Sequence, residues 1–443
     1  MSKFIIHGGK KLKGTYTVSG AKNAAPKLLI ASLLTKKKCV FHNIARISDT
    51  YRSLDALTSL GASIQFIKKN SVAIQCADIY SSEIPLESMS ARQSVIFIGA
   101  TLARTGHVVI YPPKGDATIG KRPINRHLAG IEALGGKIIK RGNNCLEIFM
   151  PRRPKSAVYT FEKNTHCGTE NLILASVFNS GKIILKNAAE EPEVDNLIKC
   201  LNEMGAKIKR IEPRAIEIIG VKPFLNGVET TAIPDRLEAA TALVLSVMTG
   251  GHIVVKNAVP ALLNKFTSAL GDMGVEISFK NNVARIKKIN YPLKPTNITT
   301  EMHPGFVTDW QPLITLLLAS MAKGESIIHE RIFETRWRYL EELKKMGIKY
   351  SLFHPKNHGA EYYNFNDSEY LPGGTYGASV YGPVKLRPAE MSSHDVRAGI
   401  DMLLAGLVAP GKTIINDPQN HIDRGYENIV AKLTDLGADI KRI

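Results

Sequence analysis

The chain has 443 residues, of which 44% are hydrophobic and 22% charged, and its 58 Lys and Arg against 40 Asp and Glu give a formal net charge of +18. This length allows two or three domains, and the composition is that of a globular protein, which excludes disordered and fibrous classes. Basic residues are scattered and only Lys36-Lys37-Lys38 forms a run, so the charge argues against a nucleic-acid partner and suits a highly phosphorylated small substrate.

The cysteine content and the hydropathy of the sequence indicate in which cellular compartment the protein lies. The sequence contains five cysteines, Cys39, Cys76, Cys145, Cys167 and Cys200. Their odd number and the absence of CxxC spacing argue against a disulfide framework and a zinc site, and predict buried free thiols in a reducing cytosol. The longest apolar runs, such as 313–321, are shorter than the ~20 residues that cross a bilayer, and the first residues show no apolar targeting core. We therefore expect a cytoplasmic protein that does not contact a membrane.

The chain opens with two β-rich segments, 3–7 and 14–18, separated by a turn region at Gly8-Gly9. This pattern predicts a β-hairpin. The stretch Ser19-Gly20-Ala21-Lys22-Asn23-Ala24-Ala25 follows and precedes an apolar helical run at 28–34. It begins the first copy of a repeated unit, which organises the rest of the chain.

The unit occurs six times, at intervals of about 70 residues except for a longer last one. Each copy has an apolar helical run, a β-rich segment, an amphipathic stretch and a small-residue turn. The turns lie at Gly61, Gly135, Gly205, Gly274, Gly347 and Gly437. Two more β-rich segments follow the first four turns, at 63–68 and 71–75, 137–140 and 145–150, 207–211 and 215–219, and 276–279 and 283–286. This order predicts an α/β protein whose mixed sheets pack against buried helices, in two halves of three units.

Polar residues precede each apolar run. They are Lys22-Asn23, Ala91-Arg92-Gln93, Thr169-Glu170-Asn171, Asp235-Arg236-Leu237-Glu238, Thr308-Asp309-Trp310-Gln311 and His394-Asp395-Val396-Arg397. Helices this apolar must be buried, so their polar first turns must surface with free N–H groups and partial positive charge. Several such starts converging would form a site for phosphate and carboxylate groups. The alternative is that Asp and Asn only cap the helices. Capping does not explain Lys22, Arg92 and Arg397, because cations oppose a helix start unless an anion is present.

Two segments suggest where the halves divide. Ala21 follows the opening strands, and 231–234 separates the third unit from the fourth; both directly precede polar helix starts. We expect one lobe of residues 1–21 with 234–443, another of residues 22–233, and closure over a ligand about these two hinges.

Two connections are unusually long. Residues 112–123 carry Asp116 between Gly115 and Gly120, which predicts a flexible arm bearing a carboxyl group, with Arg122 and His127 at its base. The long interval before Gly437 reflects a Tyr-, Gly- and Asn-rich segment, 353–388, which has the composition of a surface insertion in the sixth unit. The sequence assigns it no role.

These motifs together resemble the enolpyruvyl transferases, over essentially the whole chain. They are the Ser19 to Ala25 stretch, Ala117-Thr118-Ile119-Gly120 with Arg122-Pro123, Asn187-Ala188-Ala189 with Glu191-Pro192-Glu193, Pro234-Asp235-Arg236, His303-Pro304 with Thr308-Asp309, and His421-Ile422-Asp423-Arg424-Gly425-Tyr426-Glu427. The branch with a UDP-N-acetylglucosamine acceptor matches better than the shikimate branch, which has Lys-Ser where this chain has Lys22-Asn23. The resemblance implies an inside-out α/β barrel of six βαβαββ repeats in two domains.

The resemblance also implies a reaction and the roles of individual residues in that reaction. The acceptor's 3-hydroxyl attacks C2 of phosphoenolpyruvate, C3 is protonated and phosphate leaves, in the first committed step of peptidoglycan synthesis. Asp309 would be the base, Lys22, Arg122 and Arg424 would hold phosphate, and Arg336 and Arg397 the donor carboxylate. The implied contacts of the acceptor or other substrate groups are Asn23, Arg92, His127, Lys163 and Ile332. No metal, organic cofactor or obligate protein partner is implied.

The chain departs from the family at several positions. Asp116 stands where a cysteine acid is usual; a carboxylic acid can donate the proton if desolvation raises its pKa, which predicts resistance to the thiol-alkylating antibiotic fosfomycin. Ile96, Arg126 and Thr165-His166-Cys167 differ around the expected acceptor site. A different uridine nucleotide acceptor is therefore an alternative, and a non-catalytic nucleotide-binding paralogue is another.

Overall fold

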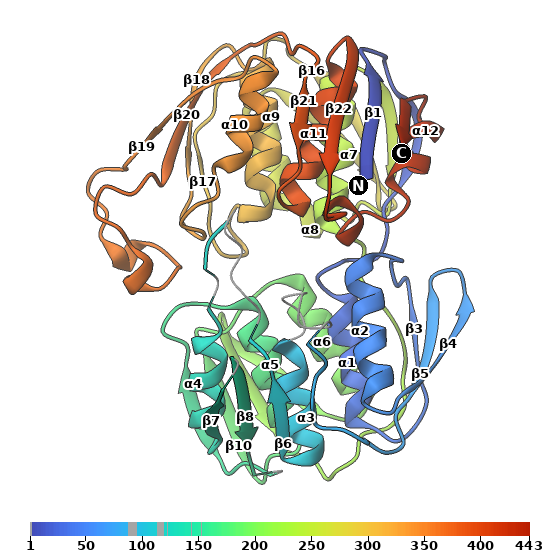
Figure 1. Cartoon of the computed structure of the whole chain (residues 1–443), viewed down its shortest axis with the longest axis vertical. Helices are drawn as coiled ribbons and strands as arrows, with labels where there is room; N and C mark the ends of the chain where they lie inside the picture. The colour runs from blue at the N-terminus through green and yellow to red at the C-terminus, as the bar shows by residue number, and fades with distance from the viewer. Residues whose placement is uncertain (1, 87–94, 113–118, 122, 143, 152) are drawn as a thin grey trace. The chain divides into compact units, whose positions relative to one another are not determined.

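A computed structural model describes the chain except residues 1, 87–94, 113–118, 122, 143 and 152. The chain forms two compact units (Figure 1). Unit 1 contains the strands at the start of the chain, residues 119–120 and Pro234–Ile443, and unit 2 contains most of residues 20–233.

Unit 2 has six α-helices among its described residues. They are α1 (Ala25–Ala31), α2 (Ser48–Ser59), α3 (Phe97–Thr105), α4 (Asn125–Ala133), α5 (His166–Ser176) and α6 (Pro192–Glu203). Its strands are β3 (Cys39–His42), β4 (Ser63–Lys68), β5 (Ser71–Gln75), β6 (His107–Ile110), β7 (Lys137–Arg141), β8 (Cys145–Phe149), β9 (Ala157–Thr160), β10 (Lys182–Lys186), β11 (Lys207–Glu212), β12 (Ala215–Ile219) and β13 (Glu229–Thr231).

Unit 1 has the same kinds of element. Its α-helices are α7 (Arg236–Thr249), α8 (Pro260–Asp272), α9 (Gln311–Met321), α10 (Arg338–Lys345), α11 (Val396–Val408) and α12 (Ile429–Asp435). Short 3-10 helices are η4 (Thr308–Trp310), η5 (Ala360–Tyr362), η6 (Asp367–Glu369) and η7 (Ile422–Arg424). Its strands are β1 (Ser2–Gly8), β2 (Lys13–Thr17), β14 (His252–Lys256), β15 (Val275–Lys280), β16 (Val283–Ile289), β17 (Ile298–Thr299), β18 (Gly324–His329), β19 (Lys349–Phe353), β20 (Gly377–Gly382), β21 (Glu390–Ser392), β22 (Gly411–Asp417) and β23 (Asp439–Arg442).

The described strands form six sheets, three in each unit, which confirms the predicted α/β fold of six repeats. The sheet β11-β12-β10-β9 shows the pattern: β9 and β10 are parallel and joined through α5, while β12 runs antiparallel to β10 and β11. A parallel pair needs a crossover connection, and the buried helix supplies it. The predicted strand pairs after the first four turn glycines are all present.

The predicted opening hairpin is wrong. β1 pairs antiparallel with β22 and β23, and β2 pairs parallel with β14, so the two strands belong to different sheets. β1 supplies the last strand of the sixth repeat and β2 the first strand of the fourth, while β13 returns to pair with β3 of the first repeat. Pairing with β22 and β23 places β1 inside a four-stranded sheet and buries Phe4 and Ile6, whereas an isolated two-stranded hairpin is at best marginally stable.

The six turn glycines all have positive φ, between 88° and 109°. After α2, Gly61 N–H donates to the Thr58 carbonyl (3.0 Å) and Ala62 N–H to the Leu57 carbonyl (2.9 Å). These two bonds form a Schellman motif, whose left-handed residue is glycine because other side chains strain there. The small-residue turns that marked the repeats are therefore helix C-caps.

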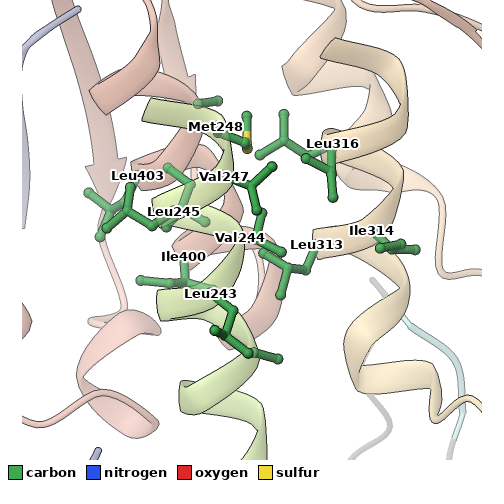
Figure 2. Close-up of a cluster of buried hydrophobic side chains, with 14 of the residues drawn as sticks. Leu243, Val244, Leu245, Val247, Met248, Leu313, Ile314, Leu316, Ile400 and Leu403 are labelled. Atoms are coloured by element: carbon green, nitrogen blue, oxygen red, sulfur yellow. The ribbon is translucent and has the colours of Figure 1, made fainter. Parts of the chain in front are cut away.

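The apolar runs are buried, as predicted. In α7 every residue from Arg236 to Met248 is buried, and in α11 every residue from Val396 to Leu407. Figure 2 shows Val244 and Val247 of α7 directed towards Leu313 and Leu316 of α9, while Ile400 and Leu403 of α11 lie on the other side of α7. The three helices thus form the core of unit 1 and carry their polar first turns to one region, the candidate site.

The long segment before Gly437 differs from the prediction. It is not in the sixth repeat: residues 354–376 connect β19 to β20, the strand pair of the fifth repeat. Nor is it all surface, because β20 lies between β18 and β19, and Ala378 and Val380 are fully buried. The Tyr- and Gly-rich composition hid this strand, since the insertion interrupts the short turn that joins the strand pairs of the first four repeats.

Candidate active site

Two of the acidic helix starts in unit 1 are caps. Asp235 accepts hydrogen bonds from Leu237 N–H (2.8 Å) and Glu238 N–H (3.1 Å) at the start of α7. Asp395 does the same for Arg397 N–H (2.8 Å) and Ala398 N–H (3.1 Å) at the start of α11. Capping therefore explains both carboxylates, and such caps typically contribute about 1 kcal/mol each.

Asp309 is different. It lies in η4 and makes no cap; its carboxylate binds Arg336 Nη1 (3.2 Å) and Arg397 Nε (3.4 Å). The Asp309 side chain is 29% exposed, whereas those of Arg336 and Arg397 are 3% and 6% exposed. The carboxylate is thus the accessible member of a triad whose two cations lie beneath it. These contacts bring the heads of α9 and α11 together, and the Arg236 guanidinium over Trp310 (5.5 Å) adds the head of α7.

Arg397 is held on a second side. Its Nη1 donates to the Tyr426 hydroxyl (3.1 Å), which lies 3.1 Å from the Thr241 hydroxyl. Burial alone would lower the pKa of Arg397, but Tyr426 and Asp309 raise it, so the guanidinium stays charged. Burial raises the pKa of Tyr426 to about 12, so the phenol stays protonated. Arg397 therefore presents a fixed positive charge, which can bind an anionic substrate group.

Arg336 is positioned by a buried carboxylate. Arg336 Nη1 donates to the Thr308 hydroxyl (3.0 Å), and that hydroxyl donates to Glu330 Oε2 (2.9 Å). The other oxygen, Glu330 Oε1, accepts the N–H groups of Ile332 (2.8 Å) and Phe333 (3.1 Å). Because arginine only donates, the Thr308 proton must point to Glu330. We call Glu330, Thr308, Arg336 and Asp309 the Glu330 relay.

In unit 2 the predicted cation Lys22 also has an acidic neighbour. Lys22 Nζ lies 2.9 Å from Asp49 Oδ2, and the Asp49 side chain is 1% exposed. The next residue, Asn23, accepts a hydrogen bond from Lys27 Nζ at its carbonyl. Lys27 is 1% exposed and pairs with Glu170 of α5 at 3.2 Å. Burial alone would lower the pKa of Lys27, but its neighbours, Glu170 first and then Cys167 and Glu193, raise this pKa overall.

The start of α5 links three helices. Glu170 Oε1 also binds His166 Nε2 (3.2 Å), and although burial opposes it, Glu170 raises the pKa of His166 to about 9. The next residue, Asn171, bonds His127 Nδ1 of α4 (3.1 Å) and accepts Gly99 N–H of α3 (2.6 Å). Two cations therefore share the Glu170 carboxylate, and two more carboxylates lie near them, Glu193 near Lys27 and Glu191 near His166.

The predicted site residues thus fall into groups. Within unit 1 the structure brings Asp309, Arg336 and Arg397 together, and Ile332 lies on the same segment as Arg336. Arg424 ends η7, two residues before Tyr426. Within unit 2, Asn23 and His127 are connected through the Glu170 region, and Lys163 is half-buried shortly before α5. Three predicted site residues lie outside the described residues: Arg92, Asp116 and Arg122.

Sequence reasoning missed Lys27 and Glu330. Lys27 is a single charge within the apolar α1, whereas Glu330 directly follows β18 and stands between His329 and Arg331. A lone charge in a run that must be buried is a signal for a buried ion pair or hydrogen-bonded carboxylate. That signal was available for Lys27 but not for Glu330, and it names no partner, because Glu170 is distant in sequence from Lys27.

The cysteines are free, as predicted, but not uniformly buried. Cys39, Cys76 and Cys200 are buried, and burial raises the pKa of the Cys39 thiol to about 11. Cys145 and Cys167 are only partly buried. Across the described part of the chain, no group of three His, Cys, Asp or Glu side chains could hold a metal ion. No described helix is long and apolar enough to span a membrane.

Comparison with known proteins gives concordant results. Residues 6–433 match the family model described as EPSP synthase (3-phosphoshikimate 1-carboxyvinyltransferase). The chain is 38% identical over 452 residues to a UDP-N-acetylglucosamine 1-carboxyvinyltransferase of Magnetococcus marinus, covering 100% of both. It is also 38% identical over 445 residues to UDP-N-acetylglucosamine 1-carboxyvinyltransferase 2 of Carboxydothermus hydrogenoformans, again covering 100% of both. The enolpyruvyl transferase NikO of Streptomyces tendae shares the fold, with a TM-score of 0.85 and 22% identity over 100% of this chain and 98% of the other.

Proposed function

Because the chain belongs to the EPSP synthase family, we propose that it transfers the enolpyruvyl group of phosphoenolpyruvate to the 3-hydroxyl of UDP-N-acetylglucosamine and releases phosphate. This is the first committed step of peptidoglycan synthesis. The observation that carries the proposal is the accessible Asp309 carboxylate above two buried arginines, combined with full-length identity of 38% to relatives named for this reaction. The cytoplasmic location expected from the sequence remains part of the proposal.

The unit 1 cluster supplies a base and an anion site. Asp309 takes the proton of the attacking hydroxyl, and its negative charge is balanced by Arg336 and Arg397 until the substrate enters. The donor carboxylate then competes for the two guanidiniums, which frees Asp309 to accept a proton. Because both cations are fixed by their neighbours before the reaction, they stabilise developing charge without reorganising.

The unit 2 cluster acts on the same substrates. Lys22 and the undescribed Arg122 hold the transferring phosphate, with Arg424 of unit 1. Asn23, His127 and Lys163 contact the acceptor. Arg92 and Ile332 complete the proposed acceptor contacts.

Asp116 is the proposed acid that protonates C3 of phosphoenolpyruvate. A carboxyl group has no thiol for an epoxide to alkylate, so we expect the enzyme to keep its activity after incubation with fosfomycin. The variant Asp116→Cys should become sensitive and gain one covalent adduct by mass spectrometry. A stoichiometric adduct on the unaltered protein would refute this assignment.

The acceptor is tested by phosphate release from phosphoenolpyruvate with a panel of uridine nucleotides. We expect turnover with UDP-N-acetylglucosamine and little with UDP-glucose, which lacks the N-acetyl group. Turnover only with another nucleotide would favour the alternative acceptor. The charged His166 is the observation that favours this alternative, because it adds a positive charge at the start of α5, near the proposed acceptor contacts. Nucleotide binding without any turnover would indicate a non-catalytic paralogue.

A further inference from the structure

The segment between β19 and β20, residues 354–376, is a folded element with a core of its own. Tyr363, Phe365 and Tyr376 are buried against one another, with Tyr362 and Tyr370 packed on them. We call residues 354–376 the aromatic insertion; it leaves the sheet of the fifth repeat beside β19 (Figure 1). Tyr370 donates to the carbonyl of His358 (2.9 Å), and Leu371 N–H donates to the Tyr376 hydroxyl (2.7 Å). Such internal packing and bonding indicate a defined shape.

The aromatic insertion bonds to the N-terminal end of segment 329–337. Glu330 N–H donates to the Tyr376 carbonyl (2.9 Å), and Asn364 N–H donates to the Arg331 carbonyl (2.8 Å). The Arg331 guanidinium lies 3.8 Å over the Tyr362 ring and donates twice to the Tyr362 carbonyl, at 3.1 and 2.9 Å. Backbone bonds, a cation–π contact and side-chain bonds therefore fix this end of the segment.

The insertion also bonds to the C-terminal end of segment 329–337. Trp337 Nε1 donates to the Thr375 carbonyl (2.8 Å), and the Trp337 side chain is buried. The residues between the two attachments form no regular secondary structure until α10 begins at Arg338, and they include Ile332 and Arg336. A segment without a helical or strand ladder takes its geometry from its attachments. Here those attachments are to the insertion, to Thr308 and Asp309, and to Thr300 and Glu301, which both bond Arg331.

We propose that the aromatic insertion is a positioning element: by clamping both ends of segment 329–337 it sets Arg336 and, through the Glu330 relay, Asp309 for catalysis. This rests on the proposed function for the roles of Arg336 and Asp309. The insertion contacts neither of them in the bonds described above, so its effect passes through Glu330, Arg331 and Trp337. It gives a role to a segment for which the sequence offered none.

The kinetic test compares attachment variants with a tip variant. Arg331→Gln and Trp337→Phe each weaken one attachment, whereas Leu371→Ala changes a side chain that is 65% exposed on the insertion. We expect the attachment variants to raise the KM for phosphoenolpyruvate about tenfold, the cost of misplacing one charge-assisted contact, with less than a twofold change in the KM for the acceptor. Leu371→Ala should match the unaltered enzyme. A purely structural role would lower the active fraction and leave both KM values unchanged, which would overturn the proposal.

A second measurement does not depend on activity. Replacing residues 354–376 with Asn-Asn, the turn that joins β15 to β16, should speed amide exchange at Ile332 and Phe333, which Glu330 protects, and leave α7 unchanged. Unchanged exchange at these amides would contradict the clamp even in an active enzyme. Conversely, faster exchange with no turnover by any variant or by the unaltered chain would support the clamp and refute the proposed function. An effect of Leu371→Ala alone would show that the insertion is instead an interaction surface.

Discussion

At the residue scale, three carboxylates that precede apolar helices have different roles. Asp235 and Asp395 satisfy backbone N–H groups of α7 and α11, whereas Asp309 binds two arginine side chains. All three are an acidic residue before a long apolar run, so the local pattern does not distinguish them. The difference comes from Arg336 and Arg397, which only the tertiary fold brings to Asp309.

This difference predicts opposite results for two isosteric variants. Asp309→Asn removes the proposed base and should lower kcat about 10²- to 10⁴-fold. It should also lower the melting temperature, because the buried Arg336 and Arg397 lose their shared anionic partner. Asp235→Asn keeps a good capping side chain, so we expect it to retain most of its rate and stability. Steady-state phosphate release and thermal unfolding measure both. Equal losses of activity would mean that the two carboxylates share one role.

His166 makes a prediction about pH. Its pKa is about 9 in the folded protein, because Glu170 and Glu191 together outweigh burial and the nearby Lys27, against about 6.5 in an unfolded chain. Since the folded value is the higher, the imidazolium stabilises the fold fully below about pH 6.5, and this stabilisation is lost as the pH rises through about 9. The stability advantage over His166→Gln, at most about 3 kcal/mol, should therefore shrink across this window. Urea unfolding of both proteins at several pH values measures it; a constant advantage would contradict the ion pair.

At the element scale, the repeated helix C-cap is the feature that sequence predicts best. The six turn glycines share a left-handed conformation. Because this conformation favours glycine, each cap shows in the sequence as a glycine, and these glycines recur at regular intervals. Strand pairs after the first four turns also follow from local alternation. The pairing of β1 and β2 does not, because each strand completes a sheet whose other strands lie far along the chain. The strand β20 was hidden for another reason: the aromatic insertion separates it from β19.

Two glycine variants test the cap. A Cβ added at Gly437, where φ is 92°, or at Gly271 within α8 would meet no atom within 4 Å, so only backbone conformation differs. Gly437→Ala should cost roughly 1–2 kcal/mol because alanine is strained in the left-handed region. Gly271→Ala should add about 0.5–1 kcal/mol by favouring the helix. Denaturant unfolding gives both values, and the same sign for the two would exclude this explanation.

At the scale of the whole molecule, the sheets of three repeats each include one strand from a distant part of the chain. β1 completes the sixth repeat, β2 begins the fourth and β13 completes the sheet of the first. The chain therefore passes between the units next to Ser19-Gly20 and next to Ile233-Pro234. At the first passage, a Cβ on Gly20 would lie 1.6 Å from the Asn43 carbonyl oxygen, so only glycine fits.

Much of the candidate site was predictable, but its connections were not. Apolar runs with polar heads identified Lys22, Asp309 and Arg397 from residue type and position alone. Buried partners were less predictable: Tyr426, which orients Arg397, was recognised only as part of a motif, and Glu330, which orients Arg336 through Thr308, was not recognised at all. Their roles depend on hydrogen bonds between residues that are distant in sequence.

The central claim is that the cations of both units serve one reaction. The most direct test is phosphate release from phosphoenolpyruvate at saturating UDP-N-acetylglucosamine by Lys22→Met, Arg397→Met and the double variant, with melting temperatures as the control for folding. We expect each single variant to lose at least about 100-fold in kcat/KM and the double variant to lose little more, because groups that act on one transition state are not additive. A single variant that keeps the rate of the unaltered enzyme would contradict the claim.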